Sequence, residues 1–307
     1  MPYEIKKNYF IFFLIIIFFI FPQFNYSAGT VAADFLLANI SARETALGGI
    51  YAPFYAKPDA SYINPASLSG IIANYIIFSH YVSVFDTHYE QLIYARPISS
   101  LDYISAFLMY DSNDNLERTD MEGYSIEKIE NYDILLGSSY CRQFFKEISG
   151  GITSKIFLSR IYKTTNLGIV FNFGLLYRNF EKRYILGATF ENIGYSTEFT
   201  KEESFFPMII RFGYGTEIYR EIDIYKIAMY IEERIHLNEI EGTETSFGLE
   251  AIYMDIFTFR YGYIFGISEG RIAIGIGVKI NDFFVDYAYQ PFFISDNAHR
   301  FTIKYIF

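Results

Sequence analysis

Residues 299–307 read HRFTIKYIF, and they alternate between two kinds of side chain. One face would carry Phe301, Ile303, Tyr305 and Phe307, and the other would carry Arg300, Thr302, Lys304 and Ile306. A period of two is the signature of a β-strand, because successive side chains of a strand point to opposite sides. The stretch therefore predicts a strand with one apolar and one polar environment.

The same alternation recurs from residue 71 onward, most clearly in residues 167–177, 257–265 and 271–280. We count fourteen such segments, centred near residues 75, 92, 107, 136, 152, 172, 188, 211, 228, 249, 261, 275, 286 and 303. An even number of antiparallel strands suits a closed barrel. We expect an all-β fold, a transmembrane antiparallel β-barrel of about 14 strands over residues 71–307 with an N-terminal plug segment.

The joints between these segments alternate in length. Brief joints lie near residues 97–101, 142–146, 178–182, 217–222, 254–256 and 280–282, and long polar joints lie near residues 111–130, 192–205, 234–245 and 290–298. Outer-membrane barrels have short turns at the periplasmic rim and longer loops at the external rim. The pattern therefore indicates a barrel of that kind.

Composition excludes several other classes of protein. Among 307 residues, 51% are hydrophobic and 20% charged, with 33 Phe, 29 Tyr and no Trp, which excludes a disordered chain. No apolar run after Phe21 reaches the roughly 18 to 20 residues of a membrane-spanning helix. With Asp plus Glu (35) exceeding Lys plus Arg (25), we expect no nucleic-acid partner. The single cysteine, Cys141, predicts neither an internal disulfide nor a thiolate metal site.

A soluble two-sheet sandwich or an internal barrel would also alternate. Two features favour lipid over water around the apolar face. Aromatic residues recur on that face, often at segment ends, as in the interfacial girdles of membrane barrels. The opposite face carries charges of both signs, which fit a wet or salt-bridged lumen: Arg211, Glu250, Arg260, Lys279, Asp286 and Lys304.

Residues 1–29 are typical of a cleaved secretory signal, because Lys6 and Lys7 precede the apolar stretch Phe10–Phe21. Residues 30–70 differ from the barrel segments. Ala33–Ala46 favours a short helix, and glycines and prolines then predict turns. We expect export to the outer membrane and a plug, or hatch, formed by residues 30–70.

Candidate site residues lie mainly in that plug. Asn64 and Pro65 predict a turn, either an anchor of the plug or an ordinary turn. Phe35, Leu36 and Leu47 would line an apolar ligand pocket or simply pack against the barrel wall.

Gly150 and Gly151 permit a bulge or kink in a strand. The four histidines, His80, His88, His236 and His299, have no tight spacing, so we expect no metal site. Glu232, Glu233 and Arg234 are most simply strand-end charges, and no catalytic motif is present, so we expect neither an enzyme nor a cofactor.

Several motifs together resemble the PorV/PorQ family of outer-membrane proteins, which is FadL-like, and they are similar to an uncharacterised spirochaetal FadL-like group. They are TALGG (45–49), DASYINPASL (59–68), ENIG (191–194), FRYGY (259–263), DYAYQPF (286–292) and HRFTIKYIF (299–307). The resemblance implies a fourteen-strand barrel with an N-terminal hatch. It also implies that a kink at Gly150–Gly151 opens the wall sideways, and that the barrel-assembly machinery reads the strand ending at Phe307.

We therefore expect a membrane protein in contact with lipid that passes small hydrophobic molecules, such as fatty acids, across the outer membrane. The alternative is a PorV-like scaffold or shuttle that interacts with secreted or surface proteins. An outer-membrane hydrolase would need a catalytic cluster that the sequence does not contain.

Overall fold

The computed structural model describes residues 33–83, 87–113, 117–120, 122, 124–197, 206–222, 224–237, 242–267, 269–292 and 296–307. The predicted signal segment, residues 1–29, lies outside the described residues. Among the described residues, no helix is long and apolar enough to span a membrane.

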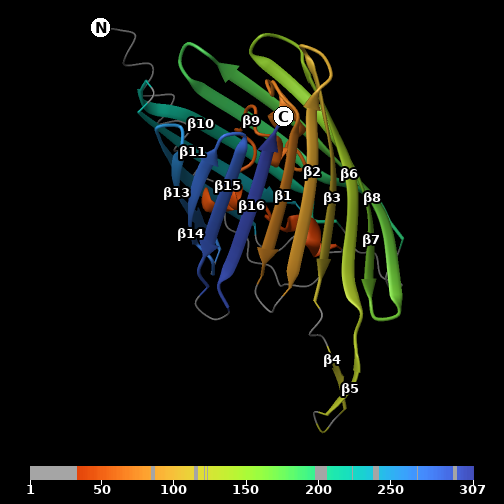
Figure 1. Ribbon diagram of the computed structural model, residues 1–307. Helices are drawn as coiled ribbons and strands as arrows, with labels where there is room; N and C mark the ends of the chain where they lie inside the picture. The colour runs from red at the N-terminus through yellow and green to blue at the C-terminus, as the bar shows by residue number, and fades with distance from the viewer. Residues whose placement is uncertain are drawn as a thin grey trace.

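Fourteen strands form one closed antiparallel barrel, in which each strand pairs with its chain neighbour and β1 pairs with β16 (Figure 1). A separate hairpin, β4 with β5, projects from one end. The barrel strands are β1 (Tyr75–Val82), β2 (His88–Pro97), β3 (Asp102–Ser112), β6 (Asn131–Gln143), β7 (Ile148–Ile161), β8 (Thr164–Asn179), β9 (Tyr184–Ser196), β10 (Ile209–Glu221), β11 (Tyr225–His236), β12 (Thr243–Tyr253), β13 (Phe257–Phe265), β14 (Ile272–Ile280), β15 (Phe283–Gln290) and β16 (Ala298–Ile306). The prediction of an all-β antiparallel barrel of about 14 strands is confirmed, and the role of the N-terminal residues as a plug stays a prediction.

The apolar face of each strand forms the outer surface. In β16, Phe301 and Ile303 are 48% and 46% exposed, whereas Arg300 and Thr302 are buried inside the barrel. A closed sheet has no free edge, so apolar side chains can cover its outside without exposing unpaired backbone groups. Of the six charged residues expected in the lumen, five are buried there, but Lys279 is exposed near the end of β14.

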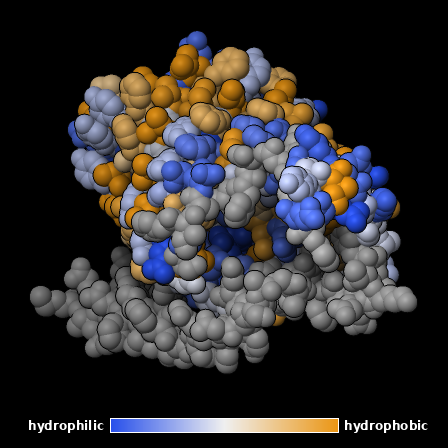
Figure 2. All heavy atoms as spheres, turned by 90° about the horizontal axis from the view of Figure 1, so that it is seen from below, coloured by the Kyte–Doolittle hydropathy of each residue, from blue (hydrophilic) through white to orange (hydrophobic). Residues whose placement is uncertain are grey.

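The two rims of the barrel differ as expected. We call short-turn rim the one with turns 98–101, 144–147, 180–183, 222–224, 254–256 and 281–282. The other, the long-loop rim, includes the connections 113–130, 197–208 and 291–297. Figure 2 looks onto the long-loop rim, where hydrophilic residues gather around a recess.

One connection on the long-loop rim is only two residues long. Tyr162 and Lys163 join β7 to β8, and Tyr162 has a φ of 56°. The two strands continue past their neighbours toward the projecting hairpin of β4 (Glu117–Thr119) and β5 (Ser125–Lys128) (Figure 1). The Tyr162 hydroxyl donates to Glu127 at 2.8 Å, and this hydrogen bond lowers the pKa of the Glu127 carboxyl.

Residues 33–74, which we call the N-terminal segment, lie inside the barrel, where they contact strands around its circumference (Figure 1). Their helices are η1 (Asp34–Leu37), α2 (Ala42–Ala46), η2 (Pro58–Ala60) and η3 (Pro65–Leu68). The continuous helix expected over Ala33–Ala46 is therefore wrong. Ala38 (φ −63°, ψ 122°) and Ser41 (φ −66°, ψ 130°) are both extended, so the chain leaves the helical conformation between η1 and α2.

The register of the sheet shifts at two places, between Phe171 and Phe173 and between Glu217 and Tyr219. It does not shift at Gly150–Gly151, which pair regularly with both neighbouring strands. Gly150 and Gly151 therefore form no bulge, and the kink that would open the wall sideways stays a prediction. A Cβ atom at Gly151 would lie 2.9 Å from the Cβ atom of Pro65, so this glycine makes room for the N-terminal segment.

Candidate functional site

The lumen is the candidate site, because polar strand residues there bind the backbone of the N-terminal segment. The inward faces of β9, β10 and β11 carry Glu191, Arg211 and Glu232, which are each at most 2% exposed. These positions belong to the polar side of the alternation, which places them opposite the apolar residues that face outward. Charges at such depth require partners, because an unpaired buried charge is strongly unfavourable.

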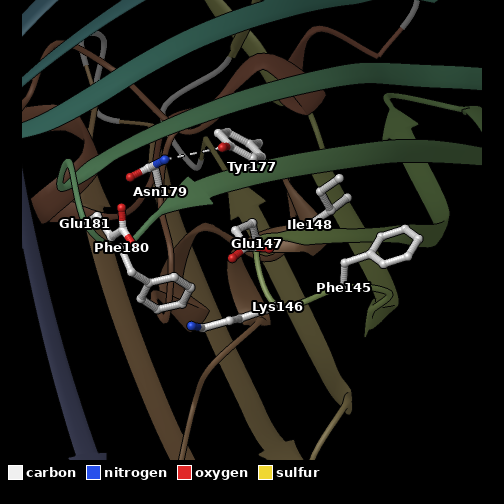
Figure 3. Close-up of a pocket in the computed structure, with 8 residues that line it drawn as sticks. All are labelled: Phe145, Lys146, Glu147, Ile148, Tyr177, Asn179, Phe180 and Glu181. Atoms are coloured by element: carbon white, nitrogen blue, oxygen red, sulfur yellow. Dashed lines mark hydrogen bonds between the residues drawn. The ribbon is translucent and has the colours of Figure 1, made fainter.

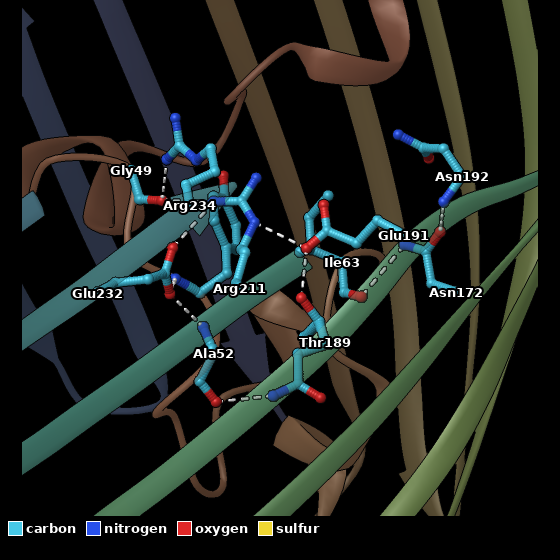
Figure 4. A network of polar contacts seen from close by, with 12 residues as sticks. Gly49, Ala52, Ile63, Asn172, Thr189, Glu191, Asn192, Arg211, Glu232 and Arg234 are labelled. Atoms are coloured by element: carbon cyan, nitrogen blue, oxygen red, sulfur yellow. Dashed lines mark hydrogen bonds and ion pairs between the residues drawn. The ribbon is translucent and has the colours of Figure 1, made fainter. Parts of the chain in front are cut away.

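Arg211 pairs with two carboxylates at once (Figure 4). Its Nε atom lies 2.7 Å from Glu191 Oε1, and its Nη1 atom lies 3.0 Å from Glu232 Oε1. Thr189 donates its hydroxyl to Glu191 at 2.5 Å. We call these four residues the Arg211 network. Its three strands are held together from the inside as well as by their backbone ladder.

Glu232 also reaches the N-terminal segment. Its Oε2 atom accepts hydrogen bonds from the backbone N–H groups of Tyr51 (2.9 Å) and Ala52 (2.7 Å). Arg211 Nη1 donates to the carbonyl of Gly49 at 3.0 Å, and Arg234 donates to the same carbonyl at 2.8 Å (Figure 4). Charged side chains of the wall therefore bind both donors and acceptors of one short stretch of backbone.

The double-glycine turn of the TALGG motif makes this approach possible. Gly48 and Gly49 have φ values of 81° and 73°, a conformation that residues with a Cβ atom rarely adopt. The wall also lacks a side chain at this point: a Cβ atom at Gly262 of β13 would lie 2.2 Å from the N atom of Gly48. The Gly48 carbonyl accepts a hydrogen bond from Ser246 at 2.7 Å.

A second buried network lies on the other side of the segment. Arg43 binds both oxygens of Glu250, at 3.0 and 3.1 Å, and Arg260 Nε lies 2.9 Å from the same carboxylate. Asp286 pairs with Arg260 at 2.5 Å. The Arg43 guanidinium also lies 4.2 Å from the centre of the Phe54 ring. Arg43 is the member that comes from the N-terminal segment, so it joins the segment to strands β12, β13 and β15.

Asn64 and Pro65 form the expected turn. The Asn64 side chain accepts from Ala66 N at 3.0 Å, which caps η3, and donates to the Ala52 carbonyl at 2.7 Å. Both residues touch the wall, because a Cβ atom at Gly174 would lie 2.1 Å from Asn64 Oδ1 and 2.8 Å from Pro65 Cδ. The turn thus lies against β7 and β8. Its role as an anchor of a movable plug stays a prediction.

Phe35, Leu36 and Leu47 are buried in one apolar cluster. The Phe35 ring meets Phe157 of β7 edge-on at 5.3 Å, and Phe157 meets Phe206 at 5.8 Å. Leu47 packs against Gly248 of β12. These contacts are those of packing on the wall, and the 550 Å³ pocket that we describe below is lined by none of the three. Their part in ligand binding stays a prediction.

The sequence reasoning missed two members of the lumen site. Glu232 and Arg234, interpreted as strand-end charges, are buried in the networks above; Glu233, which faces the other way, binds Thr245 at 2.7 Å. Alternation with the outward Ile231 and Ile235 was the available signal.

Among the described residues, no group of three or more His, Cys, Asp or Glu side chains is arranged to hold a metal ion. His80 pairs with Glu90, and His299 bonds to Tyr287.

The closed fourteen-strand barrel has the fold of several outer-membrane proteins of known structure. The toluene transporter TodX of Pseudomonas putida superposes with a TM-score of 0.63 at 12% identity, over 86% of this chain and 97% of TodX. The monoaromatic hydrocarbon channel CymD gives 0.61 at 12% identity, over 89% and 98%. A FadL homologue of Pseudomonas aeruginosa gives 0.55 at 9% identity, over 93% and 99%.

No protein-family model matches the sequence, and no curated protein matches it. The likeness is therefore one of fold, and it is FadL-like. Neither the PorV/PorQ family nor the spirochaetal group appears among these matches, so that part of the resemblance stays a prediction.

Proposed function

We propose that this protein is an outer-membrane channel that passes small hydrophobic molecules, such as fatty acids, and that the N-terminal segment is its gate. The observation that supports this most is the closed fourteen-strand barrel whose fold is that of TodX and CymD, which are described as a toluene transporter and a monoaromatic hydrocarbon channel. An apolar cluster around Phe35 lies within the same lumen. No covalent step is needed.

We assign the gate to the N-terminal segment because this segment fills the lumen. Wall side chains hold the N-terminal segment through hydrogen bonds at Gly49, Tyr51, Ala52 and Arg43. A solute crossing the barrel has to displace part of this segment, because its residues occupy the middle of the lumen. The predicted export signal and the barrel's likeness to outer-membrane channels support the proposed location. No contact among the described residues favours the PorV-like alternative over a channel.

A reversible cross-link tests the gate. Ser61 of the segment and Ser105 of β3 have their Oγ atoms 3.0 Å apart, so the double variant Ser61→Cys/Ser105→Cys, made with Cys141→Ser, would tie the segment to the wall. We expect oxidation to reduce uptake of labelled fatty acid or toluene into proteoliposomes by at least about tenfold, and reduction to restore it, because a locked segment removes the conducting state.

The matched control links two wall strands and adds no covalent bond to the segment. Because Thr302 also accepts from the Ala42 N–H, the oxidised and reduced forms of this same variant are compared. Ser79 of β1 and Thr302 of β16 have hydroxyl oxygens 2.9 Å apart, so Ser79→Cys/Thr302→Cys forms a similar bond within the barrel. Uptake by this variant should not respond to oxidation. If wild-type protein takes up neither solute, the proposed function is wrong. If uptake persists when the Ser61–Ser105 bond has formed, the channel remains but the segment is not its gate.

A further inference from the structure

We propose that a pocket on the short-turn rim binds the headgroup of a zwitterionic phospholipid, phosphatidylethanolamine, from the membrane leaflet beside it. The pocket lies between the β6–β7 and β8–β9 turns, away from the lumen site, and has a volume of about 550 Å³, within the range of ligand pockets (Figure 3). Its lining comes from residues 145–148, 177 and 179–181. This inference is separate from transport and needs only that the barrel lies in a membrane.

The charges of the pocket match a headgroup that has one phosphate and one ammonium. Lys146 supplies an ammonium, and Glu147 and Glu181 supply carboxylates. None of the three forms an ion pair with another described residue, so their charges are available to a ligand. A phosphate accepts charge-assisted hydrogen bonds from a lysine, and an ethanolamine ammonium donates them to carboxylates. With two carboxylates to one ammonium, the pocket disfavours a headgroup that is only anionic.

The surroundings of the pocket suit a lipid better than a soluble metabolite. Phe144 and Phe145 are 56% and 68% exposed, and Ile148 is 39% exposed beside them. Lys146 Nζ lies 5.8 Å from the centre of the Phe180 ring, and the two side chains approach one another from different turns (Figure 3). Aromatic rings at the end of a membrane barrel lie at headgroup depth, where acyl chains begin.

Backbone contacts hold the two turns in place before any ligand binds. The Arg178 N–H donates to the Glu147 carbonyl at 2.7 Å, which joins one turn to the strand that enters the other. Asn179 Oδ1 accepts from Lys182 N at 2.7 Å within the second turn. The Arg178 guanidinium lies between the Phe180 ring (4.3 Å) and the ring of Tyr55 (3.9 Å). A site fixed in this way loses little conformational entropy on binding.

Native mass spectrometry of the full barrel in detergent tests the site. The folded protein is given equal amounts of phosphatidylethanolamine, phosphatidylglycerol and diacylglycerol, and the retained lipid is measured. We expect wild-type protein to retain phosphatidylethanolamine most. Lys146→Gln should lower that retention about two- to fivefold, the effect of one charged contact at a partly exposed site. Glu147→Gln/Glu181→Gln should shift retention toward phosphatidylglycerol.

Lys226→Gln is the matched control, because Lys226 lies on the same rim but pairs with Glu217 and does not line the pocket. It should leave lipid retention unchanged. Equal retention of the three lipids by wild-type protein, or equal losses in the Lys146 and Lys226 variants, would overturn the proposal. Binding of free O-phosphoethanolamine as tight as that of the lipid would assign the pocket to a soluble ligand and would also overturn it.

Discussion

Arg211 is a buried cation that binds several partners in the lumen at once. It is 2% exposed and holds two carboxylates and a backbone carbonyl, those of Glu191, Glu232 and Gly49. The planar guanidinium of arginine presents several donors in fixed directions, which a lysine ammonium cannot do. A single residue thus joins β9, β10 and β11 to the N-terminal segment.

We predict that Arg211→Met destabilises the barrel by about 3–5 kcal/mol, because it leaves two buried carboxylates without their cation. The measurement is denaturant unfolding of the protein reconstituted in lipid. Arg183→Met is the control: Arg183 forms a 2.9 Å pair with Glu217, but it is 56% exposed, so its loss should cost at most about 1 kcal/mol. Similar losses for both variants would contradict the buried network.

The sequence indicates which way some site residues point, but it does not reveal their partners. Glu232 and Arg234 stand at alternating positions, so their inward direction could be inferred from the pattern of β11. Their partners could not, because Tyr51 and Ala52 are distant in the chain and bind through backbone atoms that carry no sequence signal. The glycines that make room for the segment could not be recognised either. At Gly187, for example, an added Cβ atom would lie 1.9 Å from the Ala52 carbonyl oxygen.

At the level of elements, the strands were predictable because an apolar outer face and a polar lumen impose a period of two on every one of them. The centres of all fourteen predicted segments fall within barrel strands, although the one near residue 75 marks only the start of β1. The helix expected over Ala33–Ala46 is interrupted at residues 38–41, where the Asn39 carbonyl accepts a hydrogen bond from Arg300 of the wall. The β4–β5 hairpin was missed because residues 111–130 were interpreted only as a long polar loop.

The register shift between β8 and β9 depends on Asn192, which has a φ of 59°. Its N–H donates to Asn172 at 2.9 Å. Its side chain donates to the Pro207 carbonyl at 3.0 Å and accepts from Lys155 Nζ at 3.4 Å. We predict that Asn192→Val destabilises the barrel by about 2–4 kcal/mol, because a β-branched residue is strained at positive φ and cannot make the side-chain bonds.

Asn192→Gly separates these two causes. It also loses the side-chain bonds but tolerates the backbone conformation, so it should cost roughly 1–2 kcal/mol less than the valine variant in the same lipid unfolding assay. Equal losses for valine and glycine would show that backbone strain at the bulge is unimportant.

Across the whole molecule, the outer surface is the feature that distinguishes a membrane barrel from a soluble one. Large apolar side chains that point outward remain substantially exposed on strand after strand, for example Leu136, Leu175, Phe212 and Phe259, each 55–60% exposed. A water-soluble protein rarely exposes so continuous an apolar surface. The polar residues that would cover such a surface in water are instead inside.

We predict that Ile276→Lys, in the middle of β14 and 52% exposed, destabilises the barrel in lipid by about 2–4 kcal/mol. Ile280→Lys, at the end of the same strand and 59% exposed, should cost at most about 1 kcal/mol, because it lies near the interface. Refolding titrations in vesicles measure both. If neither lysine has an effect, the outer face does not contact hydrocarbon.

The last barrel strand binds the first part of the described chain. Lys304 of β16 lies 2.5 Å from buried Asp59, Thr302 accepts from the Ala42 N–H at 3.0 Å, and Arg300 donates to the Asn39 carbonyl at 2.6 Å. Asp59 precedes Lys304 in the chain, so it is synthesised earlier. The seam between β1 and β16 therefore closes with residues that also bind an earlier part of the chain, and these contacts favour assembly of the barrel around the N-terminal segment over its later insertion.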